Sequence, residues 1–238
     1  MLKTIISKVI PAKFRERIKD FKNLYWDSYL IKSYSQEGED LILLRVFENK
    51  AKGFYVDVGA HHPFRFSNTY LFYRKGWWGI NIDAARDSIK LFKKFRPRDI
   101  NLEIAISDKN EEMTYYVFDE PALNTFDEKL AEERVRATKY KIIDKIKIRT
   151  KTLTEVLDRY MPEDQQIDFL TIDTEGSDIK VLLSLDWRRY KPDIVLIEVL
   201  NYTYLEDIYY SEIYNLMRKN GYSAFAKTFN TLFFKRTG

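Results

Sequence analysis

Short apolar runs alternate along the chain with segments of helical periodicity. The runs have the length and composition of buried strands, at about 54–58, 79–83, 101–107, 169–173 and 194–198. Amphipathic helical patterns follow at about 68–75, 86–95, 177–185 and 208–219. Strands that alternate with helices predict an α/β fold, with a mainly parallel sheet that carries helices on both faces. The final runs, 222–227 and 231–235, predict a closing antiparallel hairpin.

The middle of the chain follows this pattern less regularly. Residues 113–118 and 146–150 predict two further strands, and 121–124 predicts a loop. The segment 127–141 is highly charged and has no clear apolar face, so it is either a solvated helix or a mobile lid over the site. Residues 152–155 have the pattern of a capping box and predict the start of a helix.

The N-terminal residues 1–26 place apolar side chains among lysines and arginines, as in a basic amphipathic helix. Such a helix packs on the domain or on a partner subunit, as in a homodimer, or makes a peripheral contact with an anionic membrane. No run of about 18 apolar residues predicts a transmembrane helix, and no signal peptide is recognisable. We therefore expect a cytoplasmic protein with a helical arm, 1–32, and a single domain, 33–238. Ser35 or a nearby polar residue is the candidate cap of the first helix of this domain.

Composition removes several classes of chemistry. The 238 residues include no cysteine, which excludes disulfides, zinc–thiolate sites and thiol nucleophiles. The net charge of +4 is mild, so we expect no nucleic-acid partner, although a basic protein can favour anionic substrates such as nucleotide-sugars.

Four acids stand at the ends of apolar runs, where a carboxylate without a partner is costly to bury. The carboxyl ends of parallel strands meet at one edge of a sheet, so we expect these side chains to form a site there. The four are Asp57, Asp83, Asp173 and Glu198.

The turn after the first strand limits the classes of ligand that this site can bind. Gly59 permits a tight turn and close approach of the backbone, but the Gly-x-Gly-x-x-Gly pattern is absent and no phosphate-binding lysine follows. This disfavours an NAD-dependent oxidoreductase and suits a nucleoside whose tail carries no phosphate. Asp83 is placed to accept hydrogen bonds from ribose hydroxyls.

Several segments together resemble the FkbM-type S-adenosylmethionine-dependent methyltransferases. The resemblance covers about 33–200, and it implies a Rossmann-like class I methyltransferase fold with a seven-stranded sheet. One departure is His61-His62-Pro63, where many relatives carry Asn-Ile-Gly. The matching segments are 35–40, 54–63, 81–84, 105–107, 169–176 and 192–198.

The resemblance implies S-adenosylmethionine as the cofactor and assigns residues to it. Asp57, Gly59 and Ala60 would line its methionine part, and Asp83 would bind its ribose. The adenine would lie against Ala84 and near Ser107. Gln36 belongs to the upstream motif that reaches the cofactor.

The acceptor chemistry needs a proton acceptor or a metal, since a sugar hydroxyl is a poor nucleophile. Asp173 and Glu198 are the candidates for binding Mg²⁺ or another divalent cation through oxygen ligands. Without a metal, Asp173 or one of the two histidines, His61 and His62, would act as the base. Tyr202 and Tyr204 are placed to stack on a sugar.

We therefore expect an O-methyltransferase that acts on a sugar hydroxyl, in a nucleotide-linked sugar or a surface polysaccharide precursor. The transfer to oxygen follows from the family resemblance and from no single residue. The alternatives are an N-methyltransferase, an O-methyltransferase of secondary metabolites, and a cofactor-binding scaffold without turnover.

Overall fold

A computed structural model describes residues 11–25, 31–199 and 204–237. The chain divides into two compact units, 1–32 and 33–238, and each is considered by itself. Within the first unit, helix α2 (Ala12–Tyr25) buries none of its residues. Residues 1–10 and 26–30 of the predicted arm, like Tyr202, lie outside the described part of the chain. Across the described residues, no helix combines the length and apolar content needed to cross a membrane.

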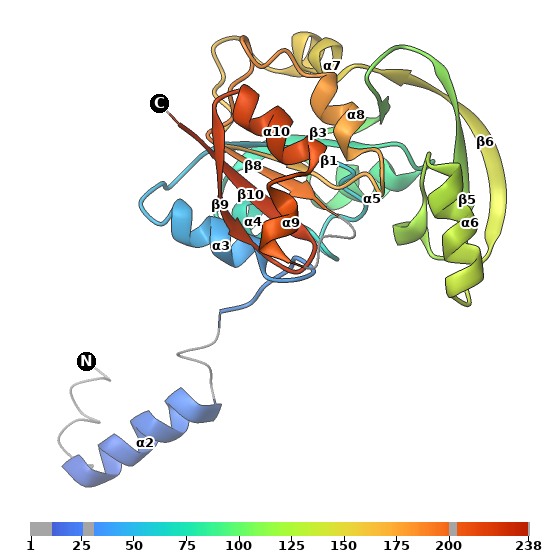
Figure 1. Ribbon diagram of the computed structural model, residues 1–238. Helices are drawn as coiled ribbons and strands as arrows, with labels where there is room; N and C mark the ends of the chain where they lie inside the picture. Colours follow the sequence, from blue (N-terminus) through green and yellow to red (C-terminus); the bar gives the residue numbers. More distant parts are fainter. Residues whose placement is uncertain (1–10, 26–30, 200–203, 238) are drawn as a thin grey trace. The chain divides into compact units, whose positions relative to one another are not determined.

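The second unit is built on a seven-stranded sheet in the order β3-β2-β1-β7-β8-β10-β9 (Figure 1). All neighbours are parallel except β10, which runs antiparallel to both β8 and β9. The predicted mainly parallel sheet and its closing antiparallel hairpin are therefore confirmed. The strands are β1 (Phe54–Val58), β2 (Trp78–Asp83), β3 (Ile100–Glu103), β7 (Phe169–Ile172), β8 (Ile194–Glu198), β9 (Tyr222–Lys227) and β10 (Thr231–Arg236).

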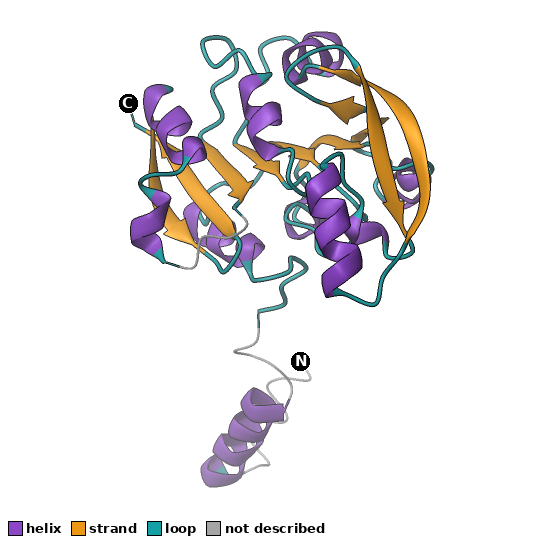
Figure 2. Cartoon of the chain, turned by 45° about the vertical axis from the view of Figure 1, so that its right-hand side comes forward, coloured by secondary structure: helices purple, strands orange, loops and turns teal. Residues whose placement is uncertain are grey.

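Helices cover both faces of this sheet, as the alternation of β1 shows (Figure 2). Phe54, Val56 and Val58 belong to one buried cluster and Tyr55 to another, because successive side chains of a strand point to opposite faces. The first cluster includes residues of α7 (Leu153–Tyr160), α8 (Asp178–Leu183), α9 (Leu205–Ile208) and α10 (Glu212–Lys219); the second includes residues of α3 (Glu39–Val46) and α4 (Tyr70–Arg74). Helix α5 (Ser88–Phe95) packs Ile89 and Phe92 on Ala60.

A smaller sheet stands beside the main one, in the order β4-β6-β5. It consists of β4 (Ala105–Ile106), β5 (Glu112–Phe118) and the long β6 (Ile142–Lys151), and it lies with α6 (Glu128–Ala137) at the right of Figure 1. The predicted strand 101–107 is thus divided between two sheets, since β3 pairs with β2 only as far as Glu103 and β4 pairs with β6. The predicted loop 121–124 contains a short 3₁₀ helix, Pro121–Leu123.

Local signals explain where several helices begin. The capping box at Thr152 is present: its hydroxyl accepts from the Glu155 amide, and the Glu155 side chain accepts from the Thr152 amide. The N-cap position of α3 is Gly38, whose φ is 88°, and the predicted Ser35 acts from outside that position, since its hydroxyl accepts from the Asp40 amide at 3.3 Å. The predicted helix 208–219 is interrupted, because Ser211 caps α10 by accepting from the Tyr214 amide.

Candidate functional site

The four predicted acids lie at the carboxyl ends of neighbouring strands. Asp57 is the penultimate residue of β1, Asp83 ends β2, Glu198 ends β8, and Asp173 directly follows β7. Their strands are adjacent in the order β2-β1-β7-β8, so the expected shared edge exists. The four side chains nevertheless do not share one cavity.

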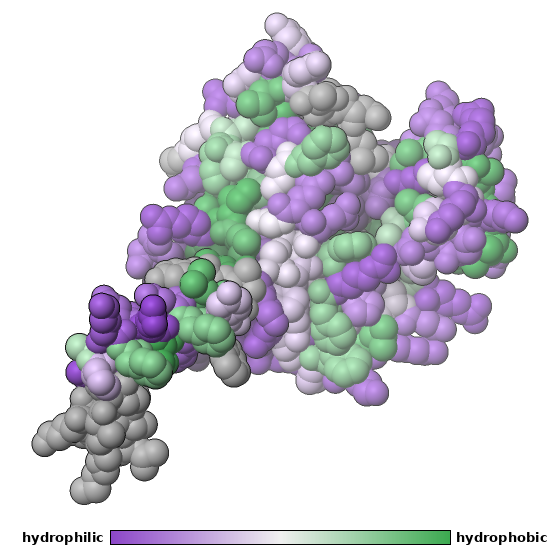
Figure 3. Space-filling model, turned by 90° about the horizontal axis from the view of Figure 1, so that it is seen from below, coloured by the Kyte–Doolittle hydropathy of each residue, from purple (hydrophilic) through white to green (hydrophobic). Residues whose placement is uncertain are grey.

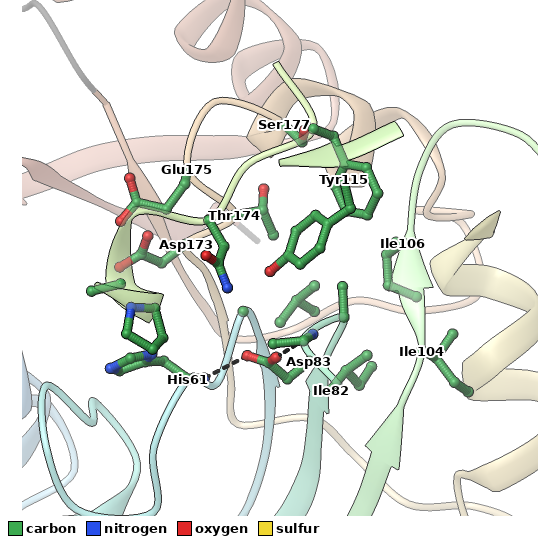
Figure 4. A pocket seen from close by; sticks show the side chains of 18 of the residues that line it. His61, Ile82, Asp83, Ile104, Ile106, Tyr115, Asp173, Thr174, Glu175 and Ser177 are labelled. Atoms are coloured by element: carbon green, nitrogen blue, oxygen red, sulfur yellow. Dashed lines mark hydrogen bonds between the residues drawn. The ribbon is translucent and has the colours of Figure 1, made fainter. Parts of the chain in front are cut away.

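A main pocket opens at this edge, with about 810 Å³ of empty space that includes solvent at its mouth. Figure 4 shows Asp173 and Glu175 on one side of it and Ile104 and Ile106 on the other, with the Tyr115 ring projecting between. Of the residues predicted from sequence, the lining includes Gln36, Gly59, His61, Asp83, Ala84 and Asp173.

Asp83 forms the floor of this pocket and is fixed by the backbone. The His61 amide donates to its Oδ2 and the Ala85 amide to its Oδ1, each at 2.7 Å. Burial raises the pKa of Asp83, and these amide hydrogen bonds oppose the rise. Since each carboxylate oxygen has a second lone pair, the side chain can accept further hydrogen bonds from a diol in the pocket.

Asp57 does not reach the pocket. Its side chain lies on the face of β1 that carries Tyr55, where the Thr69 hydroxyl donates to Oδ2 at 2.8 Å. Beneath it, the fully buried Arg96 donates to Thr69, to the Tyr55 hydroxyl and to Asp99. Burial raises the pKa of Asp57 to about 6, and the charge of Arg96 opposes the rise. The sequence did not reveal this network, because Arg96 precedes a proline and predicts only the end of a helix.

The turn after β1 is held between two other strands. The amides of Gly59 and Ala60 both donate to the Ile82 carbonyl, at 2.9 and 3.1 Å. Gly59 has φ 85°, and a Cβ there would lie 1.7 Å from the Asp173 carbonyl oxygen. The turn therefore shapes the pocket through packing. The amides of Gly59 and Ala60 already donate to the Ile82 carbonyl and are not free to bind a ligand. Ala60 and Ser107 are buried and do not line the pocket.

The two histidines have different surroundings. His61 has φ 52°, lines the pocket, and its buried Nε2 has no hydrogen-bond partner. Burial lowers the pKa of His61, which keeps its ring neutral at pH 7. His62 lies outside the pocket lining, and its Nδ1 accepts from the amides of Phe64 and Arg65, at 3.2 and 3.1 Å. The His62 ring thus holds the loop, whereas His61 offers a free nitrogen.

A second, smaller pocket of about 300 Å³ continues from the first, with Gln36, Phe66 and Asp173 common to both. Its wall comes from two segments far apart in sequence. Glu39 accepts from the hydroxyls of Thr228 and Thr231, both at 3.2 Å, and Glu37 accepts from the Asn230 amide at 2.8 Å. Its remaining lining residues are Asn68 and Glu198.

Carboxylates concentrate where the two pockets meet. Oxygens of Asp173, Glu175 and Glu198 lie within 4.8 Å of one another, and Glu198 Oε2 is buried without a hydrogen-bond partner. Burial and then the charge of Asp173 raise the pKa of Glu198 to about 11. The Asp173 carboxylate faces the cavities, but the surrounding protein shields it from bulk water. This desolvation, followed by the negative charges of Glu175 and Asp178, raises the pKa of Asp173.

Within the charged segment 127–141, residues Glu128–Ala137 form helix α6, which makes an ion pair and a hydrogen bond beside the site. Arg134 pairs with Glu175, and its other nitrogen donates to the Leu123 carbonyl at 2.8 Å. The Thr125 hydroxyl donates to the Glu175 carbonyl at 2.7 Å. The segment that leads to α6 supplies Tyr115, Asn124 and Phe126 to the pocket wall, a contribution that their sequence did not reveal.

Comparisons with known proteins place this site in context. A family model described as the methyltransferase FkbM domain matches residues 57–224. No match was found among curated proteins. A solved TehB-like SAM-dependent methyltransferase from Corynebacterium glutamicum is 12% identical, with 96% of this chain and 100% of that chain covered and a TM-score of 0.41. A precorrin-6y C5,15-methyltransferase from Geobacter metallireducens is also 12% identical, with 90% and 96% covered and a TM-score of 0.44.

Proposed function

Because the chain belongs to the FkbM methyltransferase family and is an S-adenosylmethionine-dependent methyltransferase, we propose that it methylates a hydroxyl group of a sugar. The observation that carries this proposal is the second pocket, which joins the main pocket at Asp173. One pocket then serves the methyl donor and the other the acceptor.

The main pocket has features that fit the cofactor. Asp83 has lone pairs left for the ribose hydroxyls, and Ile82, Ile104 and Ile106 offer an apolar wall to the adenine. Ala84 and Gln36 also line this pocket. When bound, the cofactor supplies a methyl group on a sulfonium, which is already activated for displacement.

The second pocket suits a polyhydroxylated ring. Glu198 and Asn68 present polar groups for sugar hydroxyls, and Phe66, exposed by 42%, offers an aromatic face. The concentration of carboxylates disfavours a phosphate group inside this pocket, because like charges repel. In a nucleotide-sugar acceptor, we therefore place the sugar ring here and the diphosphate outside.

Asp173 is the proposed general base. It lies where the pockets meet, so the acceptor oxygen can take the methyl group while its proton passes to the Asp173 carboxylate. A raised pKa suits this role, since it makes Asp173 a stronger base than an ordinary carboxylate. Glu198, neutral at pH 7, would donate a hydrogen bond to the acceptor. His61, with its free nitrogen, is the second candidate for the base.

A divalent cation is the competing explanation for the carboxylates. Asp173 and Glu198, joined by Glu175, offer oxygen ligands that Mg²⁺ or Mn²⁺ accepts, and a metal would favour their ionised forms. Either arrangement lowers the barrier for a hydroxyl nucleophile.

A methyl-transfer screen distinguishes these proposals. Labelled S-adenosylmethionine is incubated with nucleotide-activated sugars, amino sugars and phenolic acceptors, each with chelator and with Mg²⁺. We expect an O-methylated sugar, and full activity in chelator would exclude the metal. Transfer only to an amine would replace the proposal with N-methylation, which an acidic pocket also favours. Cofactor binding without any turnover across a broad panel would favour a scaffold.

A further inference from the structure

Helix α2 presents an apolar stripe that no described residue of its own unit covers. Phe14, Ile18, Phe21 and Tyr25 are exposed by 58%, 47%, 58% and 72%. At about 100° per residue they fall within about 60° of one another around the helix axis. Large exposed apolar side chains in a contiguous row mark a surface that binds something.

The charged residues of α2 are sorted around this stripe. At about 100° per residue, Arg17 and Lys22 lie roughly 60° and 80° from Phe14, on opposite sides of it. The acids Glu16 and Asp20 lie about 120° or more from Phe14, on the far side of the helix. Figure 3 shows hydrophobic and hydrophilic side chains gathered on different sides of this helix. Arg17 and Lys22 thus border the apolar stripe and both acids are turned away from it, while Lys19, about 140° from Phe14, lies on the far side with them.

This arrangement selects among possible occupants. A helix of a second copy would present the same basic border, so an isologous pairing would bring like charges together. An anionic lipid surface complements both features, because the stripe enters the acyl boundary while lysines and arginines meet the head groups. The aromatic side chains of Phe21 and Tyr25, whose ring centroids lie 4.6 Å apart, suit that interface.

We propose that α2 lies in the plane of an anionic lipid surface, with Phe14, Ile18 and Phe21 inserted, and attaches the methyltransferase to it. The attachment is reversible, since a single amphipathic helix gives moderate affinity that depends on surface charge. This proposal of membrane attachment does not depend on which acceptor the enzyme methylates.

The test uses the full chain in a vesicle flotation assay. Vesicles of phosphatidylcholine alone are compared with an equimolar mixture of phosphatidylcholine and phosphatidylglycerol, at low and high salt. We expect binding to the mixed vesicles, at least about tenfold weaker binding to the neutral ones, and release by salt. Replacing Arg17 and Lys22 by glutamine should weaken binding about fivefold for each charge removed.

Variants on the two sides of α2 separate the lipid contact from general effects. The double variant Phe14→Ser, Phe21→Ser should lose vesicle binding, whereas Glu16→Gln, Asp20→Asn should retain or strengthen it. Binding of S-adenosylhomocysteine, measured by calorimetry, should stay unchanged in both, which shows that the catalytic unit is folded.

Three results would overturn the proposal. They are equal binding to neutral and anionic vesicles, binding unaffected by the serine variant, and no vesicle binding at all. In the last case, sedimentation identifies the true occupant: a dimer that the serine variant dissociates points to a second copy, and a monomer points to the protein's own domain.

Discussion

Asp83 and Asp57 illustrate how two aspartates on adjacent strands acquire different uses. Asp83 lines the pocket and accepts from the backbone amides of His61 and Ala85, which leaves it further lone pairs for a ligand. Asp57 lies level with Asn81, two residues short of Asp83, and is occupied by Thr69 above the buried Arg96. We infer that Asp83 binds the cofactor directly and that Asp57 supports the strand end.

The pair gives a matched test of cofactor binding. Asp83→Asn should weaken S-adenosylhomocysteine binding about 10- to 100-fold, because hydrogen bonds to a charged carboxylate are lost. Asp57→Asn should change the affinity less than about threefold, since a buried residue outside the pocket acts only through the strand. Titration calorimetry measures both. An equal loss in the two variants would contradict the assignment.

Asp57 also makes a prediction about stability and pH. Because its pKa rises from the ordinary 3.8 to about 6, the folded protein holds this proton more tightly than the unfolded chain. The resulting stabilisation is present below the ordinary pKa and is lost as pH rises through about 6. Relative to Asp57→Asn, the wild type should therefore lose about 2 kcal/mol of unfolding free energy between pH 4 and 6.

Urea unfolding at a series of pH values gives this difference, and other titrating groups cancel because both proteins carry them. A difference that stays constant across the range would show that Asp57 keeps an ordinary pKa.

Among the elements, the contact between the ends of β1 and β7 fixes the geometry of the site. Gly59 sits against the Asp173 carbonyl, and the same turn donates two amides to Ile82 at the end of β2. The positions of the acids on three strands are thereby linked through one glycine. The order of helices and strands was predictable from hydrophobic periodicity, since buried strands and amphipathic helices differ in period.

Element boundaries were predictable only where a local signal set them. The capping box at Thr152 is such a signal, because its hydrogen bonds join residues three apart. The split of 101–107 into two strands depends on pairing with β2 and β6, which are distant in sequence. The start of α3 depends on the conformation of Gly38, which a search for a polar cap overlooks.

The glycine contact predicts a clear contrast between two alanine variants. Gly59→Ala should cost at least about 2 kcal/mol, since the new Cβ would meet backbone that has to move. Gly76→Ala is the control: its φ is 95° but nothing lies within 4 Å of the added Cβ. The free energy of unfolding of that variant should fall by only about 1 kcal/mol, the cost of placing alanine at a positive φ. Thermal or urea unfolding compares the two, and similar losses would refute the contact.

At the scale of the whole molecule, two pockets meet at one carboxylate. The carboxyl edge of the sheet and Asp83 could be predicted, because the ends of parallel strands converge. The second pocket could not, because residues 36–39 join residues 228–231 only in the folded chain. The pocket wall near Tyr115 was equally hidden, since it belongs to the smaller sheet. Tyr204, predicted to meet the sugar, is 68% exposed and lies outside the lining of both pockets.

The meeting of the two pockets at Asp173 is the central claim, and single-turnover methyl transfer to the best sugar acceptor tests it most directly. Asp173→Asn should lower the rate of transfer about 10²- to 10⁴-fold. Its affinity for S-adenosylhomocysteine should remain within about threefold of wild type. Asp108→Asn, a substitution of an exposed acid outside both pockets, serves as the control. An Asp173→Asn variant that transfers the methyl group to the sugar at the wild-type rate would contradict the account.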